Sequence, residues 1–477
     1  MDRSRPATGW LSVVLVGMIF LVAAPQGVAA QPVTHARSSG RDQQRVSLRQ
    51  AVSTALTRNL RMADARLAVE EKERRRRESF SQFFPTIDLA YTGQWSRYRN
   101  AVNTQALAGQ HDSRWAVRGD GGKTSGFAPD YPYRIDPYRQ FSMSATMTQP
   151  LYTGGRYVNQ YKYAQLGVDF TSLQFDVERQ DLTLDVVDAY YQLVQSYMLL
   201  QVADESIRAL EAFRNQTIEF YRAGVSAKVD VLSAEGQLAT ARVQRTQALT
   251  DIENNRATLN YLLRNPQETT YSIDLDLAYI PNSYRIPDVY SVAAANRIEI
   301  RQANISIEQA MALVKTAKAD LLPTVNVQAQ VTRLNDDWNT FDPEAVQDPM
   351  VWSLQGVLTW SFNMFGFRET VQERRATQAR AFVARQQLVE QIMRDVKQAY
   401  QNMKRSERDI ADNRKAVEFR TENFRINKER YKEQVATYIE VLDAQRQLAV
   451  SEGDLYTSQA NYRINQATLE RQMGTLR

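Results

Sequence analysis

The chain contains no cysteine among its 477 residues and only two histidines, His35 and His111. Without cysteine it can form no disulfide, no thiolate metal site and no lipid-modified N-terminal cysteine. Histidine is the commonest metal ligand and a frequent general base, so two isolated histidines argue against a catalytic or metal centre. No intact catalytic motif is present either. We therefore predict no enzyme activity and no cofactor.

Long apolar runs are also scarce. One run of about 15 residues, Trp10–Ala24, follows Arg3 and Arg5 and precedes the small residues Val28-Ala29-Ala30. This pattern predicts a signal peptide over residues 1–30. A membrane anchor is the alternative, but a spanning helix needs about 20 apolar residues. No later run is long enough, so we predict that the exported chain crosses no membrane as a helix.

An excess of charge of one sign is missing as well. Removing residues 1–30 takes away two arginines and one aspartate and lowers the net charge from +5 to +4. Basic and acidic residues are mixed, which is typical of a solvated surface and predicts no nucleic-acid partner. The densest basic run, Arg74–Arg77, could bind phospholipid headgroups. Four neighbouring glutamates favour a solvated helix face instead.

A long repeat is present. The stretch Tyr221–Leu238 (YRAGVSAKVDVLSAEGQL) returns as Tyr431–Leu448 (YKEQVATYIEVLDAQRQL), at an offset of 210 residues. Similarly, FFPTI at Phe83–Ile87 returns as LLPTV at Leu321–Val325. Solenoid repeats have periods of roughly 20–50 residues, so this offset indicates a duplicated half-molecule. We predict a first repeat over 31–270, a connector over 271–290 and a second repeat over 291–477.

Each repeat contains two stretches in which apolar and polar residues alternate, as in a strand with two different faces. They are Thr86–Trp95, Phe141–Gln149, Val325–Thr332 and Trp352–Trp360. Strands of about ten residues can cross a tilted path through a bilayer, and a face of Asp, Asn, Gln, Ser and Thr suits a wet lumen. A soluble, half-buried sheet is the alternative. Polar loops, residues 96–140 and 334–350, join the paired strands.

Helical patterns fill most of the remaining chain. In the first repeat, Ser47 begins a helix with a capping box and Pro85 follows its end. A glycine turn at Gly154-Gly155 then precedes a long helix, and Gly224 marks a hairpin before the return helix Ser226–Leu263. The second repeat is predicted to contain helix Ser291–Leu322, a glycine turn at Gly366, the long helix Arg368–Lys432 and the return helix Ala436–Met473.

The first long helix carries two apolar stripes. The first has heptad spacing, which is typical of a coiled-coil seam. It comprises Leu166, Phe170, Leu173, Val177, Leu184, Val187, Tyr191, Val194 and Met198; the second comprises Leu182, Val186, Tyr190, Leu193, Tyr197 and Leu200. Two stripes predict neighbours on two sides, as in a ring or layer of helices. A bundle helix with one broad core face is the alternative.

Four strands cannot close a barrel, and open strand edges in hydrocarbon leave unpaired backbone groups that cost several kcal/mol each. Closure in a membrane therefore requires several chains, with eight, twelve or sixteen strands. An eight-stranded barrel would be filled by its own side chains, so a channel requires at least three subunits.

These features together resemble the TolC family of outer-membrane efflux proteins. The resemblance rests on the duplicated plan, the SLRQAV opening, the proline before each first strand, the PLYTGG turn and the doubled Val-acid-Val-Leu-x-Ala block, and it covers about Ser47–Met473. It implies a mainly α fold with membrane β-structure: a homotrimer whose periplasmic α-helical barrel continues into a 12-stranded β-barrel in outer-membrane lipid.

The resemblance also implies a function. Members of the family serve as the exit duct of a tripartite efflux or type I secretion system, with a periplasmic adaptor (membrane fusion protein) and an inner-membrane transporter as partners. Whether the substrate is a drug, a metal or a secreted protein stays open. A periplasmic coiled-coil adaptor or structural protein without a pore is the alternative reading.

Several residues match functional positions of the family. The adaptor-docking tips match Arg222, Ala223, Gly224, Val225 and Ser226 in the first repeat, and Lys432, Gln434 and Val435 in the second. The family usually has glycine where Gln434 stands.

A second set matches the periplasmic aperture of the family. Glu440 and Asp443 match its acidic pair, and three copies would place six carboxylates in one constriction that favours cations. Asp230 and Tyr431 match positions that help to latch the closed gate. The arginine partner of that latch falls at Ala436, so the latch must differ here. Ordinary exposed charges at helix ends are the alternative reading.

Overall fold

A computed structural model describes residues 45–96, 138–335 and 350–476. The predicted signal peptide, both histidines and most of the two predicted loops lie outside these ranges. Within the described residues, every helix is too short or too polar to span a bilayer. In the same ranges, no three histidine or acidic side chains gather as a metal site would require.

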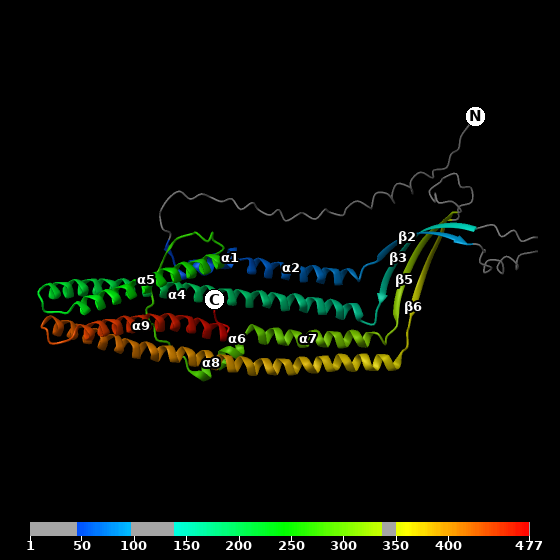
Figure 1. The fold of residues 1–477 in the computed structure, drawn as a ribbon. Helices are drawn as coiled ribbons and strands as arrows, with labels where there is room; N and C mark the ends of the chain where they lie inside the picture. Colours follow the sequence, from blue (N-terminus) through cyan, green and yellow to red (C-terminus); the bar gives the residue numbers. More distant parts are fainter. Residues whose placement is uncertain (1–44, 97–137, 336–349, 477) are drawn as a thin grey trace, which may run out of the picture. The chain divides into compact units, whose positions relative to one another are not determined.

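The described chain follows one plan twice (Figure 1). The first repeat contains β1 (Arg45–Val46), α1 (Leu48–Arg58), α2 (Leu60–Ser81), β2 (Thr86–Ser96), β3 (Tyr138–Tyr152), α4 (Arg156–Arg222) and α5 (Lys228–Leu263). After β4 (Ser272–Ile273), the second contains α6 (Ile286–Asn296), α7 (Ile298–Ala319), β5 (Thr324–Asn335), β6 (Met350–Thr359), α8 (Met364–Lys432) and α9 (Tyr438–Gln472). Each repeat therefore supplies two long strands and one pair of long antiparallel helices.

The first predicted helix is wrong in one respect, because it is broken at Asn59. The capping box of Ser47 and Gln50 is confirmed. However, Asn59 has an extended backbone, and its side chain accepts a hydrogen bond from the Arg61 amide, which starts a new helix. The Nδ2 group of Asn59 donates to the carbonyl of Leu262, 2.8 Å away. The break therefore supplies a donor to the carboxyl end of α5, where backbone carbonyls lack partners in their own helix.

The predicted helix Ser291–Leu322 is also two helices, α6 and α7, broken at Arg297. The Arg297 Nη1 group donates to the carbonyl of Arg471, 3.0 Å away, in the last turn of α9. Arg297 thus supplies a donor to the carboxyl end of α9, as Asn59 does to the carboxyl end of α5. In addition, α6 begins earlier than predicted, at Ile286, because a proline is favourable in the first turn of a helix.

A third correction concerns Gly366. The predicted turn at Gly154-Gly155 is confirmed, with positive φ at both residues. Gly366 instead lies in the first turn of α8, where its amide donates to the side chain of Asn363. A capping asparagine replaces the glycine turn, so α8 begins at Met364 rather than Arg368.

The four predicted strands form one antiparallel sheet in the order β2-β3-β5-β6. In the middle of the sheet, their register aligns apolar residues with apolar residues and polar residues with polar residues. One row joins Leu89, Ala145, Val331 and Trp352, and the adjacent row joins Asp88, Thr146, Gln330 and Ser353. The sheet therefore has one apolar and one polar face, as the alternation predicts.

The apolar face of this sheet is exposed. Trp352 is 73% exposed, Ile87 69% and Leu354 67%, and no element in the described part of the chain covers them. The predicted alternative of a half-buried soluble sheet requires these side chains to be buried, so that alternative is not supported.

The helices form a layer in which α4 occupies a central place (Figure 1). It packs against α2 and α5 on one side and against α7 and α9 on the other, while α8 packs against α7 and α9. Leu182 and Val186 of the second predicted stripe belong to a core with α1 and α5, whereas Leu173 of the first stripe packs with Ile298 of α7. Further along α4 the two stripes share one core, because Val194 and Met198 of the first stripe join the second. The prediction of neighbours on two sides is confirmed.

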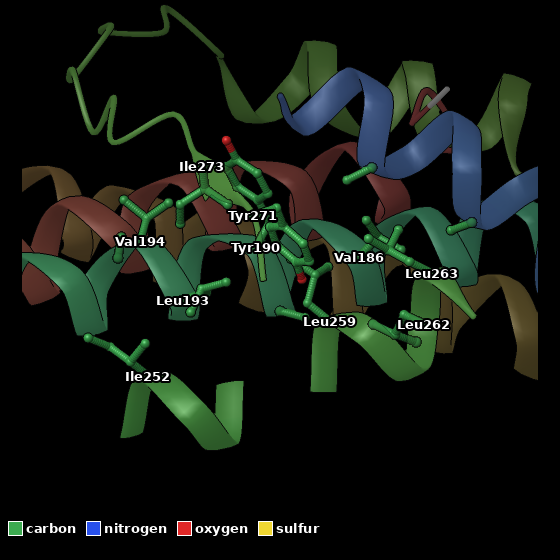
Figure 2. Close-up of a cluster of buried hydrophobic side chains, with 14 of the residues drawn as sticks. Val186, Tyr190, Leu193, Val194, Ile252, Leu259, Leu262, Leu263, Tyr271 and Ile273 are labelled. Carbon is green, nitrogen blue, oxygen red and sulfur yellow. The ribbon is translucent and has the colours of Figure 1, made fainter. Parts of the chain in front are cut away.

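The largest core lies where α4 meets α5 and the connector. Figure 2 shows Tyr190 and Leu193 of α4 beside Leu259 of α5, with Tyr271 and Ile273 of the connector close by. The buried Tyr190 hydroxyl accepts from the amide of Asp274, and burial raises the pKa of Tyr190 to about 12. The connector thus packs on the core of the first repeat, which Ala460 of α9 also joins.

The basic run of α2 lies on a solvated helix face, as predicted. Arg74, Arg75 and Arg77 each pair with a glutamate four residues earlier, and all these side chains are largely exposed. Such pairs stabilise a helix by a few tenths of a kcal/mol at most.

Candidate functional site

The two helical hairpins end in turns of the same construction. In the first, the amide of Gly224 donates to the Tyr221 carbonyl and that of Val225 to the Phe220 carbonyl. In the second, Gln434 donates to Tyr431 and Val435 to Arg430. Both patterns satisfy the last carbonyls of a long helix and require a left-handed residue after its end.

That left-handed residue differs between the two turns. Gly224 has a φ of 74° and Gln434 a φ of 60°. Glycine adopts this conformation without penalty, whereas a residue with a side chain pays roughly 1–2 kcal/mol for it. Gln434 therefore preserves the shape of the turn that glycine forms in the first repeat.

The predicted docking residues lie at these tips. Val225 is 52% exposed and Val435 68% exposed, although both are apolar. Each tip also carries an ion pair one turn earlier, Arg222 with Glu219 at 2.8 Å and Lys432 with Glu429 at 2.9 Å. An apolar, exposed point with charged flanks is thus presented twice by each chain. Of the other predicted tip residues, Ala223 is exposed in its turn and Ser226 is half-buried.

The predicted aperture acids lie at the start of α9, one turn apart. Glu440 closes a capping box with Thr437, whose hydroxyl donates to Oε1 over 3.0 Å. These hydrogen bonds, with a smaller contribution from Arg430, lower the pKa of Glu440. Asp443 accepts from Arg446 at 2.6 Å and from Gln447.

Each acid therefore has an arginine that sequence reasoning missed. Arg430 of α8 approaches Glu440 at 3.8 Å, and Arg446 bonds Asp443 within α9. The i,i+3 spacing of Asp443 and Arg446 could have revealed the second pair. The first joins two helices and had no local signal. All four side chains are 45–61% exposed, so both pairs are well hydrated.

Asp230 occupies the place in α5 that Glu440 occupies in α9. Its carboxylate accepts from the Ser226 hydroxyl at 2.6 Å and from the Ala227 amide at 3.2 Å. All of these partners belong to its own turn, so within one chain Asp230 fixes the first tip.

Tyr431 lies apart from the acids, in a buried cluster between the two hairpins. Its ring packs against those of Phe213 and Phe220 of α4, with centroids 5.1 and 5.6 Å away. Its hydroxyl lies 3.4 Å from the Thr217 hydroxyl. The structure thus brings Glu440 and Asp443 together on one helix and separates them from Tyr431, which joins the hairpins.

A second contact joins the hairpins beside this cluster. The hydroxyl of Ser233 in α5 lies 3.2 Å from that of Tyr438 in α9. Sequence reasoning missed Tyr438, because a tyrosine in the first turn of a helix gives no signal of its partner 205 residues away.

Comparison with known proteins gives a consistent result. The profile described as outer membrane efflux protein matches residues 51–263 and 289–475, one match in each repeat. Nodulation protein T of Rhizobium leguminosarum bv. viciae is 22% identical over 330 residues, which are 66% of this chain and 65% of that protein. Outer membrane protein TolC of Escherichia coli (strain K12) is 20% identical over 310 residues, 63% of each chain. The chain thus spans slightly less than two thirds of the length of these two relatives.

The fold is shared with solved structures. The crystal structure of the Campylobacter jejuni CmeC outer membrane channel superimposes with a TM-score of 0.72 at 16% identity, covering 90% of this chain and 85% of that one.

Proposed function

Since this chain belongs to the outer membrane efflux protein family, we propose that three copies of it form the outer-membrane exit duct of a tripartite efflux or type I secretion system. The duct conducts substrate passively. Energy and substrate arrive from an inner-membrane transporter through a periplasmic adaptor. The chain itself carries out no catalysis.

The observation that carries this proposal is the exposed apolar face of the four-stranded sheet. Exposing so continuous an apolar surface to water is unfavourable, whereas bilayer hydrocarbon solvates it. The opposite face carries Asp88, Thr146, Gln330 and Ser353 in one row across the strands, which suits a water-filled lumen. An apolar outside and a polar inside are the requirements of a barrel in lipid.

Ring closure explains both open edges of the structure. Among the described elements, β2 and β6 each pair on one side only, and α8 and the α2–α5 pair form the two margins of the helix layer. When β6 of one copy pairs with β2 of the next, α8 of the first copy also packs beside the α2–α5 margin of the second. Three copies give twelve strands, the smallest multiple that leaves a channel.

The tips and the acids take distinct roles in this duct. The exposed Val225 and Val435, with their charged flanks, are placed to meet the adaptor. Glu440 and Asp443 supply six carboxylates at the periplasmic aperture. Their partners Arg430 and Arg446 are 49% and 61% exposed, so the two ion pairs are hydrated and weak.

Fractionation and mass measurement test the duct. The mature protein should require detergent for extraction from the outer membrane, and the extracted particle should have the mass of three chains. A water-soluble monomer would refute the proposal.

Conductance in planar bilayers tests the aperture. The wild-type channel should favour cations, and Glu440→Gln combined with Asp443→Asn should reduce that preference. An exposed acid pair distant from the tips, Glu70→Gln with Glu71→Gln, is the matched control. Unchanged selectivity in the first double variant would refute the proposed role of Glu440 and Asp443 but would not affect the proposal of a trimeric duct.

A further inference from the structure

The two repeats build the base of their strand pairs in the same way. In the first, β2 begins with Thr86 opposite Thr148; in the second, β5 begins with Thr324 opposite Thr359. The next residue then donates a side-chain hydrogen bond in both cases: Gln149 to the Phe83 carbonyl at 2.9 Å, and Trp360 to the Leu321 carbonyl at 3.1 Å. Phe83 and Leu321 hold the same place in the FFPTI and LLPTV repeats, so the positions of the two repeats can be matched one by one.

The junction between the two repeats inside one chain, where β3 meets β5 and α7, is closely packed. Here β3 pairs with β5, and the turn after β3 packs on the end of α7. A Cβ atom at Gly154 would lie 2.7 Å from the Ala319 carbonyl oxygen and 2.8 Å from the Leu322 Cβ atom. Two residues further, Arg156 forms an ion pair with Asp320 at 2.6 Å.

The corresponding segments at the outer edges have no such partner within the described chain. Phe365, in the place of Gly154, is 85% exposed, and Phe84, in the place of Leu322, is 53% exposed. The residues that correspond to Arg156 and Asp320 are Phe367 and Gln82. The ionic contact therefore has no counterpart at these edges, where a phenylalanine and a glutamine replace the charged residues.

The position at which α8 begins explains why an aromatic residue fits at 365. At the inner junction a glycine turn brings backbone against Leu322. After β6 the helix begins already at Met364, so a side chain, rather than a glycine backbone, projects from the equivalent segment.

We propose that Phe365 of one copy packs on Phe84 of the neighbouring copy and locks β6 of the first to β2 of the second. The partner is a second copy of this chain, because the occupied junction inside the chain is the template for the empty one. This inference rests on the proposed function, which requires ring closure. The same matching places Thr359 opposite Ala90 of the neighbour, since Thr148 lies opposite Gln328.

Disulfide cross-linking tests the contact, and the absence of native cysteine makes every cross-link assignable. Phe84→Cys with Phe365→Cys should give covalent dimers and trimers in most chains when outer membranes are oxidised with copper phenanthroline. Each single variant should give none. Phe84→Cys with Phe382→Cys is the matched control, because Phe382 is an exposed aromatic residue about 25 Å further along α8.

A second pair separates the contact from the ring. Ala90→Cys with Thr359→Cys reports only strand pairing between copies. Cross-links from this pair, with none from the Phe84 and Phe365 positions, would overturn the aromatic contact and leave the duct intact. If neither pair cross-links and the extracted particle has the mass of one chain, the proposed ring itself fails.

A variant without cysteine gives an independent measurement. Phe365→Ala should lower the temperature at which the detergent-extracted trimer dissociates, whereas Phe382→Ala should leave it unchanged. Equal dissociation temperatures for both variants would contradict the contact even if folding of the cysteine pairs were impaired.

Discussion

Replacing Tyr431 by alanine should loosen the two hairpins near their tips. The Tyr431 side chain is 7% exposed and packs on two phenylalanine rings of α4, Phe213 and Phe220. Deleting the ring leaves a cavity between α8 and α4 that the rigid helices cannot fill completely. The substitution thus weakens the contact by which the second hairpin is held against the first.

The size of the effect follows from this burial. Replacing a buried aromatic side chain by alanine costs about 3–5 kcal/mol. A local loss of about 3 kcal/mol raises the population of separated hairpins roughly 100-fold. Tyr431→Phe is the matched control, since it keeps the ring and loses only the 3.4 Å contact with the Thr217 hydroxyl, a cost of at most about 1.5 kcal/mol.

Hydrogen exchange and conductance measure this loosening. In Tyr431→Ala, amides at the start of α9 and the end of α8 should exchange faster, and the single-channel conductance should rise because the hairpins separate more often. Tyr431→Phe should stay close to wild type in both assays. Equal exchange and equal conductance in the two variants would refute the reasoning that this cluster holds the hairpins together.

Three further predictions concern the turns, the cap and the buried charges. Gly224→Ala should destabilise the first tip by about 1 kcal/mol because Gly224 has a positive φ. Gly236 lies inside α5 with open space around it, so Gly236→Ala should stabilise the protein by about 0.5–1 kcal/mol, and chemical denaturation compares the two variants. Hydrogen bonds lower the pKa of Glu440 in the folded protein below its ordinary 4.5. The stability that its cap contributes should therefore be complete above pH 4.5 and should be lost as the pH falls through the lowered pKa. Hydrogen-exchange rates of the amides in the first turn of α9 would follow this loss. Arg471 is buried and pairs with the partly exposed Asp181 and Glu299, so Arg471→Ala should destabilise the protein more than the exposed Arg446→Ala, which should cost less than about 1 kcal/mol. Thermal unfolding in detergent compares them, and similar losses would contradict the role of burial.

Local patterns in the sequence were sufficient for the elements that depend on periodicity. The two stripes of α4 and the four two-faced strands were predicted close to their observed positions, because an element with one apolar face repeats its apolar residues with a period of 3.6 or 2 residues. The turn at Gly224 was predicted from the residue type, since glycine adopts a positive φ without penalty. The repeat also revealed that Gln434 would stand in the place of a glycine.

Tertiary contacts decided what no local pattern contains. The helix breaks at Asn59 and Arg297 are set by carbonyls at the ends of return helices, which lie 203 and 174 residues away in the sequence. Tyr221 and Tyr431 occupy the same place in the repeated motif, yet Tyr221 is 46% exposed and Tyr431 is buried. A motif specifies the turn that it forms, but the surface that a side chain meets depends on the neighbouring helix. Tyr431 of α8 packs on α4 of the first hairpin, whereas Tyr221, which lies on α4 itself, faces largely outward.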